Sequence, residues 1–393
     1  MLRILHLADL HLGWEPSYLS ADKKEIRCRE RDRLLKKAVD YALSPEGDIH
    51  AVLLVGDLFE DYNPGEVLVK QVMEQISRLT RAGVLVVTVP GNHDEITYRE
   101  SVYRRFAEQW PGSLVTNSMP ELAVSTEING TRLNIYSLAF TGGATRPEAI
   151  EAFPRSNEAG LHIGAFHGSL DWHGVPDRSL PLNSSLLVGA DYDLIALGHY
   201  HRFMEKQIGK GKAIYPGSVE FKSFNDPGTG YLTVEEVSAG HVKIDTIPLD
   251  IRRYQIHSLD LAGINSPQEL SQACRDLADE ELMLQLNLTG TPGFPVNTES
   301  LNAELEPYFF YLEINNYVQY FAESFLENIA QESTVRGAYV RRMREKQEKV
   351  AAGWALKEVI HEWSQEEVTD EWAQEVLKRA LLKGMAALEG SDL

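Results

Sequence analysis

The chain is poor in cysteine, short of positive charge and free of long apolar runs. Its 393 residues include two cysteines, Cys28 and Cys274, which lie far apart in the sequence. A disulfide framework is therefore not expected, and a reducing, cytoplasmic environment is favoured. The apolar runs are too short to cross a bilayer, and Asp9 and His11 interrupt the N-terminal one. Neither a membrane anchor nor a signal peptide is therefore expected.

Acidic residues outnumber basic residues by 58 to 38, which gives a formal net charge of −20. Contacts to nucleic-acid phosphates need Lys and Arg, so this balance argues against a chain that grips DNA tightly by itself. It does not exclude a nuclease, because metal ions neutralise local carboxylates and a partner subunit can carry the DNA contacts. The mix of 43% hydrophobic and 24% charged residues is typical of a globular protein.

Apolar strands and amphipathic helices alternate over the first 250 residues. Runs such as AVLLVGD (51–57) are continuously apolar, as expected of strands that are buried on both faces. Residues 25–43 and 65–82 carry apolar side chains at helical spacing, and the stretches 230–237 and 242–249 predict a hairpin. We therefore expect an α/β layer protein with a mixed sheet or two stacked sheets.

Two smaller parts follow the α/β region. The first predicts a small βαβ unit with a capped helix, and from about residue 307 onward the chain reads as helical. The apolar stripe of the last helix, from about 370 to 388, can bury against the protein's own helices or against a partner coiled coil. The predicted domains are residues 1–250, 251–297 and 298–393.

Polar motifs end several of the apolar runs in the first region. Because the carboxyl ends of strands in an open α/β sheet border the ligand crevice, residues far apart in sequence can converge there. The glycines in these motifs let the backbone turn sharply and approach the site closely. The motifs are DLH (9–11), GD (56–57), GNHD (91–94), FHG (166–168) and GHYH (198–201).

The residue types in these motifs suit a site for two metal ions. Carboxylates, imidazoles and an amide oxygen favour borderline or hard divalent ions over metals that prefer thiolates. Alternate residues of an extended segment point the same way, so Asp9 and His11 can bind one ion together. Asp57 can bridge two ions with its two oxygens. Two ions about 3.5–4 Å apart can activate a water and hold a phosphate opposite it.

Each motif alone also has a plainer structural interpretation. DxH and GD are common in turns, and a lone His167 is usually a hydrogen-bonded core histidine. Their occurrence in order, each at a strand end, favours the two-metal interpretation instead. The histidines outside the motifs are interpreted as structural or surface residues. They are His6, His50, His162, His173, His241, His257 and His361.

The ordered motif set resembles the calcineurin-like metallophosphoesterase superfamily over about residues 1–250. Within it, the opening ILHLADLHLG, the phrase FHGSLD, the segment IYPGSVEFKSFND and the small βαβ unit with a helical tail resemble SbcD-type DNA-repair exonucleases. The resemblance implies an α/β fold: a β-sandwich flanked by helices, with a small α+β capping domain and a helical C-terminal tail. In that family the tail docks on an SbcC-type ATPase.

The resemblance also implies a role for each polar residue of the motifs. His93 would face the scissile phosphate without binding a metal, and Asp94 would orient His93. Glu95 receives no role. Manganese is the implied ion, although the ligand set alone also accommodates iron, zinc or cobalt. The implied ligands of one ion are Asp9, His11, Asp57 and His201, and those of the other are Asp57, Asn92, His167 and His199.

The implied activity is exonuclease and endonuclease cleavage of DNA near ends or hairpins, in double-strand break repair, by a homodimer with an SbcC-type ATPase partner. A small-molecule phosphodiesterase or phosphatase with the same metal core is the alternative. A third interpretation is a scaffold that recruits the ATPase. The C-terminal extension favours the nuclease, because an enzyme for small substrates needs no docking tail.

Two further segments remain open to more than one interpretation. Trp14 and Tyr18, in the loop 12–25, can contact DNA or cover the core. The basic stretch 336–349 can bind DNA or a partner's acidic surface, but a solvated helix face is slightly favoured.

Overall fold

A computed structural model divides the chain into two compact units, residues 1–252 and 253–393, and each is described by itself. His173 and His361, interpreted above as structural or surface residues, lie outside the described residues. The structure describes residues 1–142, 146, 150–155, 157–171, 179–226, 228–292, 294, 296–318, 323–354 and 369–388.

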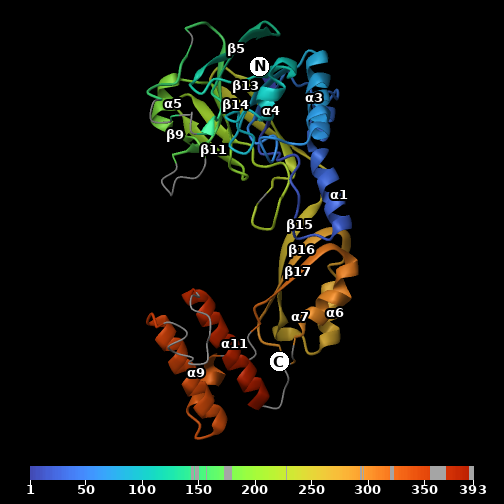
Figure 1. The fold of residues 1–393 in the computed structure, drawn as a ribbon, viewed down its shortest axis with the longest axis vertical. Coiled ribbons are helices and arrows are strands. Elements are labelled where there is room, and N and C mark those ends of the chain that lie inside the picture. Colours follow the sequence, from blue (N-terminus) through green and yellow to red (C-terminus); the bar gives the residue numbers. More distant parts are fainter. Residues whose placement is uncertain are drawn as a thin grey trace. The chain divides into compact units, whose positions relative to one another are not determined.

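The first unit is built on two six-stranded sheets, which confirms the predicted α/β layers (Figure 1). The first sheet runs, in spatial order, β14 (His241–Pro248), β13 (Tyr231–Ser238), β1 (Leu2–Leu7), β2 (Ala51–Val55), β3 (Leu85–Val89) and β4 (Ser113–Leu114). The second runs β11 (Met204–Ile208), β12 (Gly211–Tyr215), β10 (Leu194–Gly198), β7 (Leu161–His167), β6 (Thr131–Ser137) and β5 (Glu121–Ile128). Two short strands, β8 (Ser169–Leu170) and β9 (Pro181–Leu182), form a separate two-stranded sheet.

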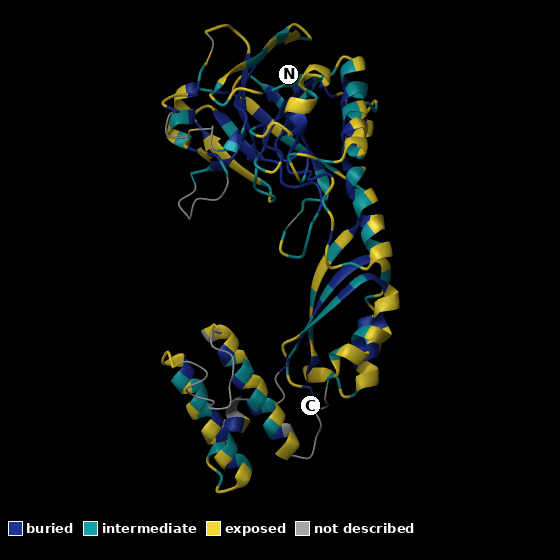
Figure 2. Ribbon diagram, in the orientation of Figure 1, coloured by how far each residue is buried: buried dark blue, intermediate teal, exposed yellow. Residues whose placement is uncertain are grey.

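One hydrophobic core joins the two sheets. Leu53 and Val87 of the first sheet belong to the same buried cluster as Ile135 and Leu194 of the second. The central strands β2, β7 and β10 are buried along their whole length, as their continuous apolar sequences predict (Figure 2). The sheets therefore form a sandwich whose central strands are fixed on both faces.

Helices cover the sandwich, and the first of them differs from expectation. The predicted helix 25–43 begins earlier and breaks at Arg33 into two helices. Its buried residues in the first half are Arg27 and Arg31, whereas Ile26, one of the apolar residues at helical spacing, is exposed. The helices of this unit are α1 (Ala21–Asp32), α2 (Leu34–Ala42), α3 (Glu66–Arg81), α4 (Val102–Arg105), α5 (Ser184–Ala190) and the 3₁₀ turn Ala107–Gln109.

The buried arginines clamp two distant loops together. The Arg31 guanidinium donates to the carbonyls of Leu10, at 3.1 Å, and Phe221, at 2.7 Å. Arg27 lies 3.1 Å from a Glu220 carboxylate oxygen. Buried guanidinium groups are tolerated because each is paired and hydrogen-bonded. The periodicity of apolar residues could not predict that this face of α1 is buried, because its buried residues are arginines.

Parallel pairing brings several strand ends to one edge of each sheet. β1 pairs in parallel with β2, and β2 with β3, while β7 lies parallel to both β6 and β10. The motifs that follow β1, β2, β3, β7 and β10 therefore leave the sandwich on the same side. This confirms the expectation that polar residues far apart in sequence converge at strand ends.

The second unit contains a three-stranded sheet that is parallel throughout. The prediction that the chain is helical from about residue 307 is wrong at its start, because β17 pairs with β16 there. The strands are β15 (Arg253–Asp260), β16 (Asp279–Thr289) and β17 (Phe309–Asn316). The helices beside them in sequence are α6 (Pro267–Arg275), α7 (Thr298–Leu305) and the 3₁₀ turns Leu261–Gly263 and Glu306–Tyr308.

The remaining helices that the structure describes in this unit share a core of their own. Leu377 and Met385 of the last helix are buried in one cluster with Ile329 and Val340 of the preceding helices. The protein's own helices thus cover part of the apolar stripe of the last helix, while Trp372 and Leu388 remain exposed. Within the part of the chain that is described, no helix is both long and apolar enough to span a membrane. These helices are α8 (Glu323–Ala330), α9 (Val335–Ala351) and α11 (Asp370–Leu388).

Candidate metal centre

The loops that leave the strands begin with strained backbone turns. Asp9, His11 and Asp57 have φ values of 54°, 46° and 49°, and His199 has 110°. Residues other than glycine rarely adopt positive φ, and such strain concentrates at functional sites. These turns point polar side chains back over the strand ends, where regular extended backbone would direct every second one into the core.

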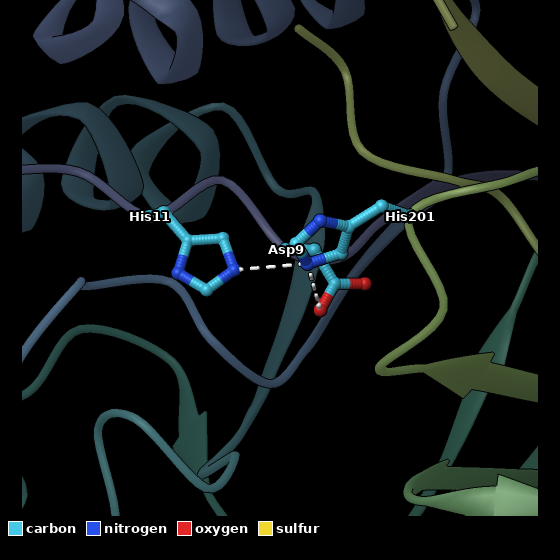
Figure 3. A group of neighbouring side chains, drawn as sticks. All are labelled: Asp9, His11 and His201. Atoms are coloured by element: carbon cyan, nitrogen blue, oxygen red, sulfur yellow. Dashed lines mark hydrogen bonds and ion pairs between the residues drawn. The ribbon is translucent and has the colours of Figure 1, made fainter. Parts of the chain in front are cut away.

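Asp9, His11 and His201 face one another (Figure 3). The Nε2 atoms of the two imidazoles lie 3.1 Å apart, and His201 Nε2 lies 3.8 Å from Asp9 Oδ1. Asp9 and His11 are almost completely buried, whereas the side chain of His201 is 23% exposed. These side chains are some 190 residues apart in sequence and meet here because β1 and β10, from different sheets, end on the same side of the sandwich.

Carboxylates from two loops hold these imidazoles by their outer nitrogens. His11 Nδ1 lies 2.8 Å from Glu60 Oε2, and His201 Nδ1 bonds to Asp226. An imidazole that donates one N–H to a carboxylate directs its other nitrogen at a metal and becomes a more basic ligand. We call Asp9, His11 and His201 the carboxylate-anchored half of the site.

Asn92, His167 and His199 form the second group. The Asn92 side-chain oxygen lies 3.0 Å from His167 Nε2 and 3.1 Å from His199 Nδ1. The outer nitrogen of His167 contacts a backbone carbonyl, that of Val55, at 2.9 Å. A Cβ on Gly56 would lie 2.1 Å from that Nδ1 atom, so glycine is required there. We call this group the carbonyl-anchored half.

Asp57 lies between the two halves. Its Oδ2 atom is 3.8 Å from His11 Nε2 and 3.4 Å from His167 Nε2. Burial opposes ionisation, but the charges of His167 and His11 hold the pKa of the Asp57 carboxyl far below its ordinary value. For His167, burial is likewise outweighed, and Asp57 raises the pKa of the imidazole to about 10. The geometry therefore suits Asp57 as the bridging carboxylate.

His93 and Asp94 are neighbours in one loop but lie in different environments, His93 exposed and Asp94 buried. The Asp94 carboxylate accepts hydrogen bonds from the Gly91 and Leu58 amides, at 2.7 and 2.8 Å, and from Tyr103 Oη. It does not contact His93, whose Nδ1 atom lies 3.0 Å from the carbonyl of Glu60. Asp94 therefore holds in place the loop that carries His93, and its role in orienting His93 stays a prediction.

Asp94 is also held in an unusual electrostatic state. Burial, together with the negative charge of Asp57, raises the pKa of its carboxyl to about 6, against the hydrogen bonds that stabilise the ionised form. The exposed His93 ring packs edge-on against His11, with 4.7 Å between centroids. His93 thus lies at the open side of the site.

The arrangement fits divalent metal ions. Ligand atoms of Asp9, His11 and His201, of His11, Asp57 and His93, and of Asp9, Asp57 and His167 each gather within 4.8 Å. The Nε2 atoms of His11 and His201 face each other at 3.1 Å, close to carboxylate groups. A divalent cation between them would supply the positive charge that these lone pairs and carboxylates attract. The donor set contains N and O ligands without thiolate, which suits hard and borderline divalent ions.

Sequence reasoning missed Glu60 and Asp226. Glu60 also pairs with Lys222 Nζ at 2.8 Å, and burial of its carboxyl is outweighed by His11 and Lys222, which lower its pKa to about 2. Glu60 follows Asp57 by three residues, and Asp226 ends the segment IYPGSVEFKSFND. Their closeness in sequence to the motifs could have indicated a role at the site. Whether their carboxylates point at the metal-binding histidines, however, depends on loop conformations that no sequence periodicity specifies.

The aromatic loop 12–25 packs on the protein itself. The Arg31 guanidinium lies 4.9 Å from the centre of the Trp14 ring, and Tyr18 Oη donates to the Lys222 carbonyl at 3.0 Å. Of the histidines interpreted as structural, His6 bonds to Glu235 at 2.9 Å. These contacts account for the side chains without a ligand.

Comparison with known proteins gives the same assignment as the geometry. Residues 2–203 match the model of the calcineurin-like phosphoesterases. The uncharacterized metallophosphoesterase YhaO of Bacillus subtilis is 26% identical over 74% of this chain and 70% of its own. The DNA double-strand break repair protein Mre11 of Thermoplasma acidophilum is 26% identical over 70% of this chain and 72% of its own, and that of Aeropyrum pernix is 36% identical over 58% and 57%. Because the match to the family model covers more than half of the chain, the chain belongs to the calcineurin-like phosphoesterase family.

Proposed function

We propose that this protein is a metal-dependent nuclease that hydrolyses phosphodiesters near the ends of DNA during double-strand break repair. The observation that carries the proposal is the convergence of both halves on Asp57. A centre for two divalent ions, which we expect to be manganese, suits phosphoester hydrolysis. The DNA substrate is supported by relatives named as Mre11 DNA double-strand break repair proteins.

Bound at this centre, two divalent ions supply an activated water and neutralise charge on the phosphate. The chain's own residues position that chemistry. Asp9, His11 and His201 would hold one ion, Asn92, His167 and His199 the other, with Asp57 shared between them.

His93 would act on the substrate itself. The Glu60 carbonyl accepts a hydrogen bond from the Nδ1–H group of His93, which leaves Nε2 to face the scissile phosphate. In its doubly protonated form, the ring would donate a hydrogen bond from Nε2–H to the phosphate and then pass that proton to the leaving oxygen. Because ligand atoms of His93 also come near those of His11 and Asp57, metal analysis of a His93 variant decides this role.

Further subunits would supply what this acidic chain lacks. A net charge of −20 is unfavourable for tight DNA binding, so we propose an SbcC-type ATPase as the partner and a homodimer as the working form. The β15–β17 sheet would serve as the capping domain and α8, α9 and α11 as the docking segment. α9 carries several basic residues of the stretch 336–349, of which Arg336 pairs with Glu332 and Lys349 with Glu345.

A test separates DNA from small substrates. The purified chain, with and without an SbcC-type ATPase, is incubated with linear duplex DNA, single-stranded DNA and bis-p-nitrophenyl phosphate, each with Mn²⁺ or with EDTA. We expect Mn²⁺-dependent cleavage of DNA, stronger with the ATPase. Turnover of the small ester without any DNA cleavage would support a small-molecule phosphodiesterase instead.

A further inference from the structure

A hollow of about 220 Å³ lies directly beside the metal centre. Asn92 and His93 line one side of it, and Tyr62, Glu95 and Tyr98 line other parts. Because Asn92 also contacts the imidazoles of the carbonyl-anchored half, the hollow shares a wall with the metal centre. A group that occupies the hollow is therefore an immediate neighbour of the phosphate held there.

Two tyrosines form an aromatic wall of the hollow. The rings of Tyr62 and Tyr98 have centroids 4.5 Å apart and an angle of 34° between their planes. Tyr98 is still 42% exposed after this contact, so ring surface remains available to a ligand. Exposed aromatic rings bind nucleobases by stacking, whatever their sequence.

The aromatic wall is fixed before any ligand binds. The Val102 amide donates to the Tyr62 carbonyl at 2.7 Å, and the Ser101 amide to the Tyr98 carbonyl at 3.1 Å. Both tyrosine loops are thus tied to the start of α4. A preorganised wall loses little conformational entropy when a ring stacks on it.

The charge of the hollow disfavours a phosphate as its occupant. Asp61 and Glu95 both line it, and Glu95 is 6% exposed with Thr97 Oγ1 donating to its Oε2 atom at 2.5 Å. Ionised carboxylates accept hydrogen bonds and repel anions, so a neutral ring with N–H groups is the suitable ligand. Nucleobases combine such a ring with N–H donors.

We propose that this hollow binds the nucleobase next to the scissile phosphate, stacked on Tyr98, with Glu95 as an acceptor for its N–H groups. The inference rests on the proposed nuclease function and adds the feature that positions the strand. It gives Glu95 a role that the motif left unassigned. It also requires that the base be unpaired, because a base inside a duplex cannot enter a side pocket.

The test removes single bases from the substrate. The full-length chain with Mn²⁺ is given end-labelled single strands that carry one abasic residue, and the products are resolved by length. Cleavage next to the abasic residue, on one side of it, is expected to slow by about tenfold, within the range that stacking of one base supports. Cuts further away are expected to keep their rates.

Variants locate the effect in the hollow. Tyr98→Ala is expected to cut the intact strand about tenfold more slowly and to become insensitive to the abasic residue, while Tyr98→Phe keeps wild-type behaviour. Tyr317→Ala, a 60% exposed tyrosine of the second unit, is the matched control that retains sensitivity. Melting curves verify that each variant is folded.

Two negative outcomes have different meanings. Equal rates for intact and abasic strands in the wild-type protein would overturn the base-binding role while leaving the nuclease in place. Cleavage of bis-p-nitrophenyl phosphate without cleavage of any DNA strand would overturn both proposals.

Discussion

Each half of the metal centre contains two imidazoles, but the halves secure these rings differently. In the carboxylate-anchored half, Glu60 and Asp226 hold the outer nitrogens of His11 and His201. In the carbonyl-anchored half, His167 is held by the backbone of Val55. A carboxylate partner makes an imidazole a stronger ligand than a neutral carbonyl does. The comparison predicts unequal affinities for the two ions, with the carboxylate-anchored half filled first.

The halves also differ in what stabilises their partners. The Val55 carbonyl belongs to a strand buried in the core, so its position follows from the fold itself. Glu60 and Asp226 come from loops, and the Asp226 segment is tied down by Arg27 and Arg31 of α1. The half expected to bind metal more tightly thus depends on electrostatic contacts outside the core.

Substitution of the residue shared by both halves is expected to have the largest effect. Asp57→Asn removes the charge between His11 and His167, so both ions should be lost and hydrolysis should fall by more than the roughly 10–100-fold typical of outer partners. Metal analysis after dialysis, together with hydrolysis of bis-p-nitrophenyl phosphate, measures both. Retention of one full equivalent of metal would show that Asp57 serves a single half.

His93→Ala is expected to leave both halves filled but to slow cleavage by about 10²–10⁴-fold, the range for loss of a general acid. Metal content and cleavage rate are measured on the same preparation. His50→Ala provides a histidine control away from the site, where His50 accepts a hydrogen bond from the Arg3 amide. Loss of an ion with His93→Ala would make His93 a ligand.

Asp226→Asn tests the unequal anchoring directly. Affinity for one ion is expected to fall by roughly 10–100-fold, while the other ion is kept, because only His201 loses its carboxylate partner. Titration with Mn²⁺ followed by calorimetry resolves the two binding steps. Asp245→Asn, which removes a surface carboxylate paired with Lys243, is the matched control. Equal weakening of both steps would contradict the comparison.

The smallest effect is expected from substitution of Glu30, which pairs with Arg27 of α1. Arg27 in turn pairs with Glu220 in the segment that leads to Asp226. Burial opposes ionisation of Glu30, but hydrogen bonds from Arg252 and Arg27 lower the pKa of its carboxyl below 4.5. The folded state therefore gains stability that is fully present above pH 4.5 and is lost as the pH falls through the lowered pKa. Glu30→Gln should cost about 1 kcal/mol at neutral pH, and the difference should shrink on acidification.

Denaturant unfolding of wild type and Glu30→Gln at pH 7 and near pH 3 checks this sign. A difference in unfolding free energy that grows toward low pH would contradict it.

Sequence reasoning located the site because its ligands follow apolar runs that had to be buried strands. Strand ends are set by local pattern, and parallel pairing then brings them together. It failed where tertiary contacts overrode pattern. Arg27 and Arg31 lie inside because Glu220 meets them, and β11 is a largely exposed, polar edge strand without alternation.

Another error has the same origin. β17 was mistaken for helix because its partner β16 lies across a helix and a turn, and pairing over that distance leaves no local mark. The hydrogen bonds from backbone amides to Asp94 likewise follow from the fold of its loop, which no local pattern specifies.

The pairing of β1 with β13 has a consequence for synthesis of the chain. The first strand made, Leu2–Leu7, pairs with Ala51–Val55 on one side and with Tyr231–Ser238 on the other. The sheet therefore cannot be completed until Tyr231–Ser238 has left the ribosome. At about 5–20 residues per second, the nascent protein spends on the order of ten seconds or more with that edge open. Contacts this distant in sequence also make folding slow. Premature termination before His199 and His201 would therefore yield a chain that lacks β13 of the first sheet and two histidines of the metal centre.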